Sequence, residues 1–579
     1  MKSDRSGFGR HRGPRSKVSV RPSRSDRRGT VLSVSAAFLL ALAFPALADT
    51  GHEHKEGDPT KLGKVHFPIS CGAASQKKFD IGLAMLHSFW YAKSDKEFAD
   101  LAAADPHCAM AHWGVAMSRF HQIWEAPPPD DLKAGVAAIA AARAAGAKTQ
   151  RERDYVEALG VYYDKSDTLD HVTRFVAYEK AAGDLAAKYP KDREASIFYA
   201  LALNGVALAL PPDKTYARQK KAGEILEPIF REMPQHPGVA HYIIHSYDFP
   251  TLAERGLDAA RRYSKIAQDS PHALHMPSHI FTRLGLWEDS IGSNLDSAAA
   301  ARKDLQQTMP GAFAFDELHA MDYLAYAYLQ TGRDAEARRV VEGASRAEKF
   351  DKQNFAAAYA LTAIPARLAL ERRNWSDAAQ VEMRPAGFPW NKFPWTESTV
   401  VFARAVGFAR LGDTASARKE IDRLEKLRDS LKSAGNMYWA DQVEISRRQA
   451  AAWLARAEKK DAEALELMRS AAALEDSTDK HPVTPGPILP AREQLGDLLL
   501  ELGKPAEALA EYRADLAASP NRLNGYYGAA RAARLSGDAA AAKSYYEKVL
   551  ALCRKADGAK EQVAEAQAFL EGKAVSELR

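Results

Sequence analysis

Two consecutive stretches near the C-terminus decide the fold: "LGDLLLELGKPAEALAEYRADLAASP" (residues 495–520) and "YGAARAARLSGDAAAAKSYYEKVLALC" (residues 527–553). Each has the pattern of a helix, a tight turn at a glycine, and a second helix. Equivalent positions recur 34 residues apart, at Gly503 and Gly537, Ala508 and Ala542, and Tyr512 and Tyr546. Small residues let two helices cross closely and large apolar residues fill the seam, so the period predicts repeated helical hairpins.

A looser version of this pattern continues upstream. Gly285, Gly332 and Gly412 each separate two helical patterns, and a degenerate unit occupies residues 370–380. A 34-residue helix–turn–helix period resembles the tetratricopeptide repeat, and the resemblance covers roughly residues 75–553. With no alternating strand pattern, the sequence predicts an all-α, tetratricopeptide-type solenoid of helical hairpins with irregular, longer central repeats.

Several segments extend the resemblance beyond generic repeats. They include "HSFWY", "DPHCAMAHWG", "HYIIHSYDFP", "HALHMPSHIFTRLG" and "KHPVTPGPILPARE". In these segments the chain is similar to a family of exported bacterial tetratricopeptide-repeat proteins. The resemblance implies the fold and export, and no particular activity.

The N-terminus has the features of an export signal. Residues 1–48 hold ten Lys/Arg and two Asp/Glu, then an apolar run that closes with Ala46-Leu47-Ala48. This pattern predicts a signal peptide cleaved before Asp49, a periplasmic or secreted protein, and no stable membrane span after cleavage. Arg27-Arg28 leaves both Sec and twin-arginine export open.

We therefore expect five segments along the chain. They are a signal peptide (1–48), a flexible N-terminal segment (49–74), a tetratricopeptide-like array with a histidine-lined groove (75–480), C-terminal repeats (481–555), and a capping helix with a tail (556–579). The signal contributes +8 to the net charge of +5, so the remainder is about −3. Without a basic surface to neutralise phosphates, a nucleic-acid partner is not expected.

The cysteines carry a prediction about redox state. Only Cys71, Cys108 and Cys553 are present. Export leads to an oxidising compartment, where Cys71 and Cys108 are the candidates for a disulfide. Cys553 lies in an apolar helical pattern, which indicates a buried, inert thiol.

Histidines gather in "SPHALHMPSHIF" (residues 270–281) and its neighbours. On a helix, His272, His275 and His279 share one arc opposite an apolar seam, and Pro277 either kinks that helix or starts a new one. His241 and His245 are four residues apart, His236 lies just upstream, and His319 shares a face with Asp322. Seven of the 17 histidines thus fall between residues 236 and 319.

Clustered imidazoles with carboxylates nearby suit a transition-metal site, because neutral imidazole is the commonest protein ligand for such ions. We predict a Zn, Cu or Fe ion as cofactor. Its candidate ligands are His241, His245, His272, His275, His279, His319 and Asp322. Asp248 is a candidate for ligating the ion or orienting a histidine. Sites of this kind often keep an open coordination position, so whether the protein is an enzyme stays open.

The alternative is a non-enzymatic interaction scaffold. Arg283, Tyr242, Tyr323 and Tyr326 would suit a peptide, protein or small acidic ligand in the same groove. The metal hypothesis requires imidazole nitrogens from at least two helices within about 3–4 Å of one another. The Pro-rich stretch at residues 479–490 is long for a repeat connection, which allows it to reach back to this site.

Overall fold

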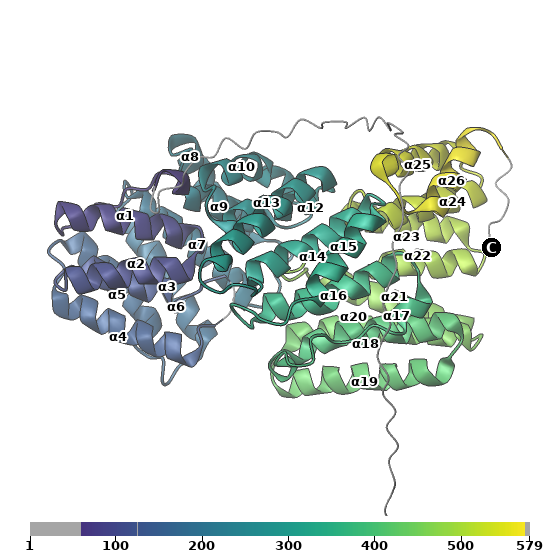
Figure 1. Cartoon of the computed structure of the whole chain (residues 1–579), viewed down its shortest axis with the longest axis horizontal. Coiled ribbons are helices and arrows are strands. Elements are labelled where there is room, and N and C mark those ends of the chain that lie inside the picture. The colour runs from purple at the N-terminus through teal and green to yellow at the C-terminus, as the bar shows by residue number, and fades with distance from the viewer. Residues whose placement is uncertain (1–58, 124–125, 574–579) are drawn as a thin grey trace, which may run out of the picture. The chain divides into compact units, whose positions relative to one another are not determined.

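The computed structural model describes residues 59–123 and 126–573 (Figure 1). Within these ranges the chain forms α-helices and short 3-10 helices, and its β structure is limited to one isolated bridge between Phe313 and Phe350. The predicted all-α class is confirmed. The expected signal peptide (1–48), residues 49–58 of the segment 49–74 and the last six residues of the expected tail lie outside the described residues.

The helices follow one another with short connections. The N-terminal ones are η1 (Pro59–Leu62), α1 (Ala73–His87), α2 (Tyr91–Ala104), α3 (Ala109–Ser118), α4 (Pro129–Ala145), α5 (Gln150–Tyr163), α6 (His171–Lys188), α7 (Arg193–Ala209) and α8 (Ala217–Glu232). Those in and after the histidine-rich stretches are α9 (Pro237–Tyr247), α10 (Ala253–Ile266), α11 (Pro271–His275), α12 (Pro277–Arg283), α13 (Trp287–Gln306), α14 (Phe315–Gln330), α15 (Asp334–Ser345) and α16 (Phe355–Glu371).

The C-terminal part continues in the same way. Its elements are α17 (Trp375–Ala378), η2 (Trp390–Lys392), α18 (Pro394–Leu411), α19 (Thr414–Ser433), α20 (Met437–Ala457), α21 (Asp461–Ser477), α22 (Ala491–Glu501), α23 (Pro505–Ala518), α24 (Leu523–Leu535), α25 (Ala539–Leu552), η3 (Cys553–Lys555) and α26 (Lys560–Leu570).

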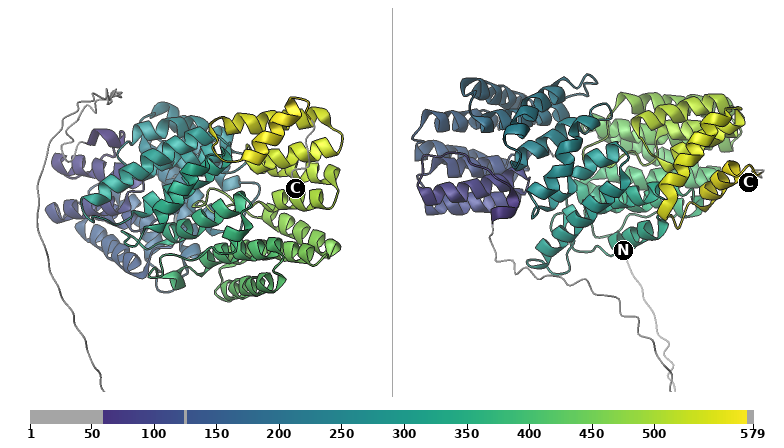
Figure 2. Two further views of the ribbon diagram at one scale, coloured as in Figure 1. Left: turned by 45° about the vertical axis from the view of Figure 1, so that its right-hand side comes forward. Right: turned by 90° about the horizontal axis from the view of Figure 1, so that it is seen from above.

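Stacked helical hairpins make up the described chain. Consecutive helices pack on each other, and alternate helices such as α14 and α16 or α18 and α20 also touch (Figures 1 and 2). The five glycines predicted at turns all have positive φ angles: Gly285 (65°), Gly332 (69°), Gly412 (81°), Gly503 (69°) and Gly537 (84°). A residue without Cβ adopts this backbone conformation at little cost, which lets one helix end and the next begin within three residues.

Pro277 starts a new helix. α11 ends at His275 and α12 begins at Pro277, the first helical position, where its missing N–H is not needed. Of the two possibilities that the sequence left open, a kinked helix or a new helix at Pro277, the structure has the new helix. His272 and His275 lie on the short helix α11, and His279 lies on α12.

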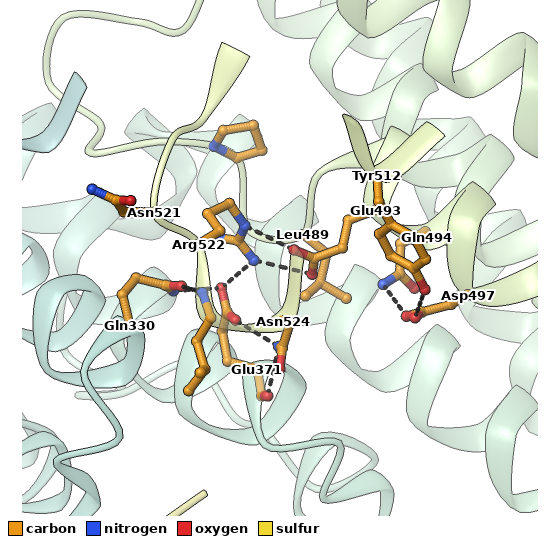
Figure 3. A network of polar contacts seen from close by, with 12 residues as sticks. Gln330, Glu371, Leu489, Glu493, Gln494, Asp497, Tyr512, Asn521, Arg522 and Asn524 are labelled. Carbon is orange, nitrogen blue, oxygen red and sulfur yellow. Dashed lines mark hydrogen bonds and ion pairs between the residues drawn. The ribbon is translucent and has the colours of Figure 1, made fainter. Parts of the chain in front are cut away.

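Buried charge ties the C-terminal repeats to the middle of the array (Figure 3). The Arg522 guanidinium, just before α24, donates to Glu493 of α22 at 2.9 Å and to Glu371 of α16 at 2.8 Å. It also donates to the Tyr326 hydroxyl of α14 at 2.9 Å. The Gln330 side chain accepts from the backbone N–H of Leu523 at 3.0 Å. These contacts fix α14, one of the helices that carries a candidate ligand.

Near the N-terminal end, a disulfide joins the segment before α1 to the start of α3. Cys71 and Cys108 are bonded, with Cα atoms 5.6 Å apart, and Cys553 is a buried free thiol. The predicted disulfide and the predicted burial of Cys553 are confirmed. Among the described helices, none has the length and apolar character needed to cross a bilayer.

Candidate metal centre

Six histidines converge from four helices in the interior of the array. His241 and His245 lie on α9, His272 and His275 on α11, His279 on α12 and His319 on α14. Their donor atoms form two groups of three, and within each group the ligand atoms lie within 4.8 Å of one another. We call His241, His245 and His272 trio A, and His275, His279 and His319 trio B.

Trio A meets the distance condition set for a metal site. The Nε2 atom of His241 lies 3.1 Å from that of His245 and 3.2 Å from that of His272. Tetrahedral nitrogen ligands around one ion are separated by about 3.3 Å, because metal–nitrogen bonds are about 2.0–2.1 Å long. The nitrogens come from two helices, α9 and α11, as the metal hypothesis requires.

Trio B is equally compact. The Nε2 atoms of His275 and His279 are 3.0 Å apart, and the His275 and His319 rings have centroids 4.2 Å apart. His275 and His279 are four residues apart in sequence, but the helix breaks between them at Pro277. His275 is therefore held by the end of α11 and His279 by the first turn of α12.

Hydrogen bonds assign the tautomers of trio B. The Nδ1 atom of His275 lies 2.7 Å from Oδ1 of Asn294, whose amide nitrogen donates to the Ser290 carbonyl. The Nδ1 atom of His279 lies 2.9 Å from Oδ2 of Asp248. Both oxygens only accept, so each neutral ring places its single hydrogen on Nδ1 and leaves a lone pair on Nε2.

In trio A, the tautomer of His241 follows from the same argument. Its Nδ1 lies 2.7 Å from the backbone carbonyl of His87, the last residue of α1, where helix carbonyls lack intrahelical donors. The Nε2 lone pair of His241 therefore faces both His245 and His272. One lone pair accepts one well-aligned hydrogen bond, so hydrogen bonding does not account for both contacts.

Burial keeps the imidazoles neutral. It lowers the pKa of His241 to about 3 and lowers the pKa of His245, His272, His275 and His319 well below 6.5. The pKa of His279 is also lowered by burial, although Asp248 opposes the shift. Neutral imidazole is the form that ligates metal ions.

Asp248 orients His279 from a position secured by two cations. Its carboxylate accepts from Arg283 and Lys480, each at 2.8 Å. Burial raises the pKa of Asp248, but these two cations outweigh burial and hold that pKa well below its usual range. Burial lowers the pKa of Lys480 to about 8. A ligating histidine that donates to a fixed carboxylate is the usual arrangement in metal sites.

Lys480 belongs to the connection between α21 and α22, residues 478–490, which we call the strap. The Tyr323 hydroxyl donates to the Thr484 carbonyl at 3.1 Å, and Arg367 donates to the carbonyls of Gly486 and Pro487. The long Pro-rich connection therefore does reach back to the histidines, as its length allowed. His481 of the strap packs against Phe355 and Trp439 instead of joining a trio.

Asp322, one of the candidate ligands, is paired with an arginine in the structure. Its Oδ1 atom accepts from Arg367 at 3.1 Å, and Arg367 in turn holds the strap. Neither trio includes Asp322 among its close donors. We therefore leave it out of the proposed ligands.

His236 belongs to a different cluster. It shares the Glu194 carboxylate with His87, through Nε2–O distances of 2.8 and 3.0 Å. The Nδ1 of His236 accepts from the Val239 N–H, and that of His87 lies 3.0 Å from the Tyr242 hydroxyl. Both Nε2 atoms have a carboxylate acceptor, so ordinary N–H···O hydrogen bonds account for these contacts without an ion. The cluster instead fixes α1 next to His241.

The expectation of an open histidine-lined groove needs correction. His241, His272, His275, His279 and His319 are between 0% and 5% exposed, and His245 is partly buried. A surface pocket lies elsewhere, lined by segments 66–70, 149–152 and 188–194. Three of its cations, Arg151, Lys188 and Arg193, are paired with Asp192, Asp154 and Glu232, and Lys191 also lines it.

Comparisons with known proteins add little to this geometry. No protein-family model matches the chain, and no curated protein matches it. A monomeric IFIT1 mutant solved with m7Gppp-AAAA is 12% identical, covering 84% of this chain and 98% of its own, with a TM-score of 0.33. The Cut9–Hcn1 hetero-tetramer of the APC/C is 13% identical, covering 85% and 90%, with a TM-score of 0.27.

A third solved structure is similar to this chain at the same low level. The human IFIT1 dimer with m7Gppp-AAAA is 12% identical, covering 77% of this chain and 90% of its own, with a TM-score of 0.31. Similarities at this level carry no argument about function.

Proposed function

We propose that this protein is an exported helical-repeat protein that binds a transition metal ion through its buried histidine cluster. The observation that carries the proposal is the 3.0 Å approach of the His275 and His279 Nε2 atoms, both assigned as lone pairs. Two buried lone pairs at this distance repel each other and lack donors, which costs about 1–3 kcal/mol for each unsatisfied group. A cation between them converts the repulsion into two bonds.

The ligand chemistry supports a borderline transition metal. All six close donors are imidazoles, a set that suits Zn, Cu and Fe and disfavours Ca or Mg, which prefer oxygen. Three of the six rings have their Nδ1 atoms fixed by an acceptor: the His87 carbonyl, the Asn294 amide and the Asp248 carboxylate. Such partners orient ligands before the ion arrives.

The disulfide supports the exported location. Cys71 and Cys108 are paired, and disulfides persist in oxidising compartments and are rare in the cytosol. The A-x-A motif before Asp49 supports the same location.

The alternative, an interaction scaffold that uses the same histidines, requires a partner to reach them. Five of the six histidines are at most 5% exposed, which keeps a peptide or protein from reaching them. We therefore propose binding of an ion and not of a macromolecule at this site.

Metal analysis of protein exported in its native host tests the proposal. We expect at least about half an equivalent of a transition metal per chain and a melting temperature that a strong chelator lowers. A metal content below roughly a tenth of an equivalent, with a melting temperature that ignores the chelator, would contradict the proposal.

A further inference from the structure

We propose that the two trios form one dinuclear copper centre, in which each copper is held by three histidines and the pair binds a dioxygen-derived bridge. This inference rests on the proposed function, because it specifies how many ions the same cluster holds and what they bind.

The donor atoms of the six histidines divide into two groups, which favours two ions over one. A single ion binds its nitrogens at about 2.0–2.1 Å, so its ligand atoms lie within about 4.2 Å of one another. The six histidines divide into two compact groups of donor atoms with no shared member. Three imidazoles per ion is a complete protein ligand set that leaves a position open.

The trios adjoin each other. The ring centroids of His245 and His279 are 6.3 Å apart, and so are those of His272 and His275. Within trio A the rings of His245 and His272 are 6.5 Å apart. Neighbouring rings of different trios are thus as close as the more distant rings of one trio, so ions held by the two trios would be neighbours, as a bridging ligand between two ions requires.

The charge that the buried site can hold favours copper over metals that are stable only as divalent ions. Imidazole ligates metal ions in its neutral form, so the ligands bring no charge, and the nearest carboxylates are already engaged. Asp248 is paired with Arg283 and Lys480, and Asp322 with Arg367. Two divalent ions would place four uncompensated positive charges in the interior, where charges are costly. Copper, which imidazole binds well, is also stable as a monovalent ion, and a monovalent pair carries half that charge.

The total charge of the two-copper centre also supports a bridging ligand derived from dioxygen. Each of the two Cu(I) ions gives one electron to dioxygen, which becomes peroxide, and both ions become Cu(II). The two negative charges of the peroxide offset the two new positive charges, so the total charge of the centre does not change and no proton is needed. The ligand has to be small, because five of the six histidines are at most 5% exposed.

Copper loading without oxygen tests the stoichiometry. Wild-type protein should bind two Cu(I) per chain, whereas His245→Ala (trio A) and His319→Ala (trio B) should each bind one. His171→Ala on α6, whose ring contacts Tyr162 and not the trios, should still bind two. Circular dichroism and thermal unfolding of each apoprotein verify that the variants are folded.

Exposure to oxygen then tests the bridge. The wild-type pair should give little electron paramagnetic resonance signal, because a shared bridge couples the two Cu(II) spins, and each single-trio variant should show one full spin per copper. One copper per wild-type chain, or two coppers with full, uncoupled spin, would overturn the dinuclear inference while leaving metal binding intact. If no copper binds but another metal does, the copper assignment is wrong. If no metal binds at all, the proposed function fails as well.

Discussion

The Nε2 atoms of His275 and His279 lie 3.0 Å apart while each ring donates its Nδ1–H to an oxygen elsewhere. The relationship has a direct consequence for the protein without metal. Both rings then keep an unfavourable contact that a bound cation would relieve, so the ion and the folded state should stabilise each other.

Replacing His279 by Ala should lower metal content and thermal stability together. The ion stabilises the folded state by about 2.7 kcal/mol at a free concentration one hundred times its dissociation constant, and the variant loses this linkage. Differential scanning calorimetry with and without chelator measures the effect. His171→Ala should retain the chelator-sensitive part of the stability, and its loss there would show that the effect is not specific to the trios.

Asn294 should act as a positioning residue for His275. Because the Asn294 carbonyl oxygen fixes the Nδ1–H tautomer, Asn294→Ala should weaken metal affinity about 10–100-fold. Asn294→Asp keeps an acceptor at this place and should restore most of the affinity. Competition with a chelating indicator measures both values. Equal affinities for the Ala and Asp variants would refute the positioning role.

Arg522 should be required for the stability of the C-terminal repeats. Arg522→Leu leaves the carboxylates of Glu371 and Glu493 buried without their cation, which costs about 3–5 kcal/mol. Urea unfolding gives the difference. Arg513→Leu on α23, where the arginine side chain is 52% exposed, is the matched control and should change stability little.

Asp515 should make stability fall as pH rises. It is 3% exposed, its Oδ2 atom has no hydrogen-bond partner, and burial together with Glu493 raises its pKa well above 3.8. The folded state therefore holds a proton that the unfolded state releases. The stabilisation is complete below pH 3.8 and is lost as pH rises through the folded-state pKa.

Asp515→Asn removes this proton linkage. We expect the variant to be more stable than wild type at pH 8 and equal to it near pH 4, as measured by urea unfolding at both values. Asp422→Asn, at an exposed position of α19, should show no such pH-dependent gain. A gain of the same size at both pH values would rule out the linkage.

The disulfide should stabilise the N-terminal helices. It closes a loop of 37 residues between Cys71 and Cys108, and cross-links of this kind typically contribute about 2–4 kcal/mol. Reduction or the double change Cys71→Ser with Cys108→Ser should lower the unfolding midpoint. If reduced and oxidised protein unfold at the same denaturant concentration, the bond has no stabilising role.

Local patterns in the sequence predicted the fold and most of the candidate ligands. The turn glycines at 503 and 537 and the shared face of His272, His275 and His279 are periodic signals that need no knowledge of distant contacts. The disulfide followed from export and the small number of cysteines. These features depend on residues close in sequence or on rare residue types.

The partners that orient the histidines could not be predicted in this way. Lys480 and Asp248 are 232 residues apart, and no local pattern marks their pairing. The His87 carbonyl became an acceptor for His241 only because α1 ends there. Burial was also missed, since a polar face opposite an apolar seam predicts a groove, whereas five of these six histidines are at most 5% exposed.

X-ray absorption spectroscopy at the edge of the metal that the natively exported protein carries tests the central claim most directly. We predict a first shell of nitrogen at about 2.0–2.1 Å, with the outer-shell pattern of imidazole rings and about three rings per ion. A first shell made of sulfur, or of oxygen without imidazole, would contradict the assignment of these histidines as the ligands.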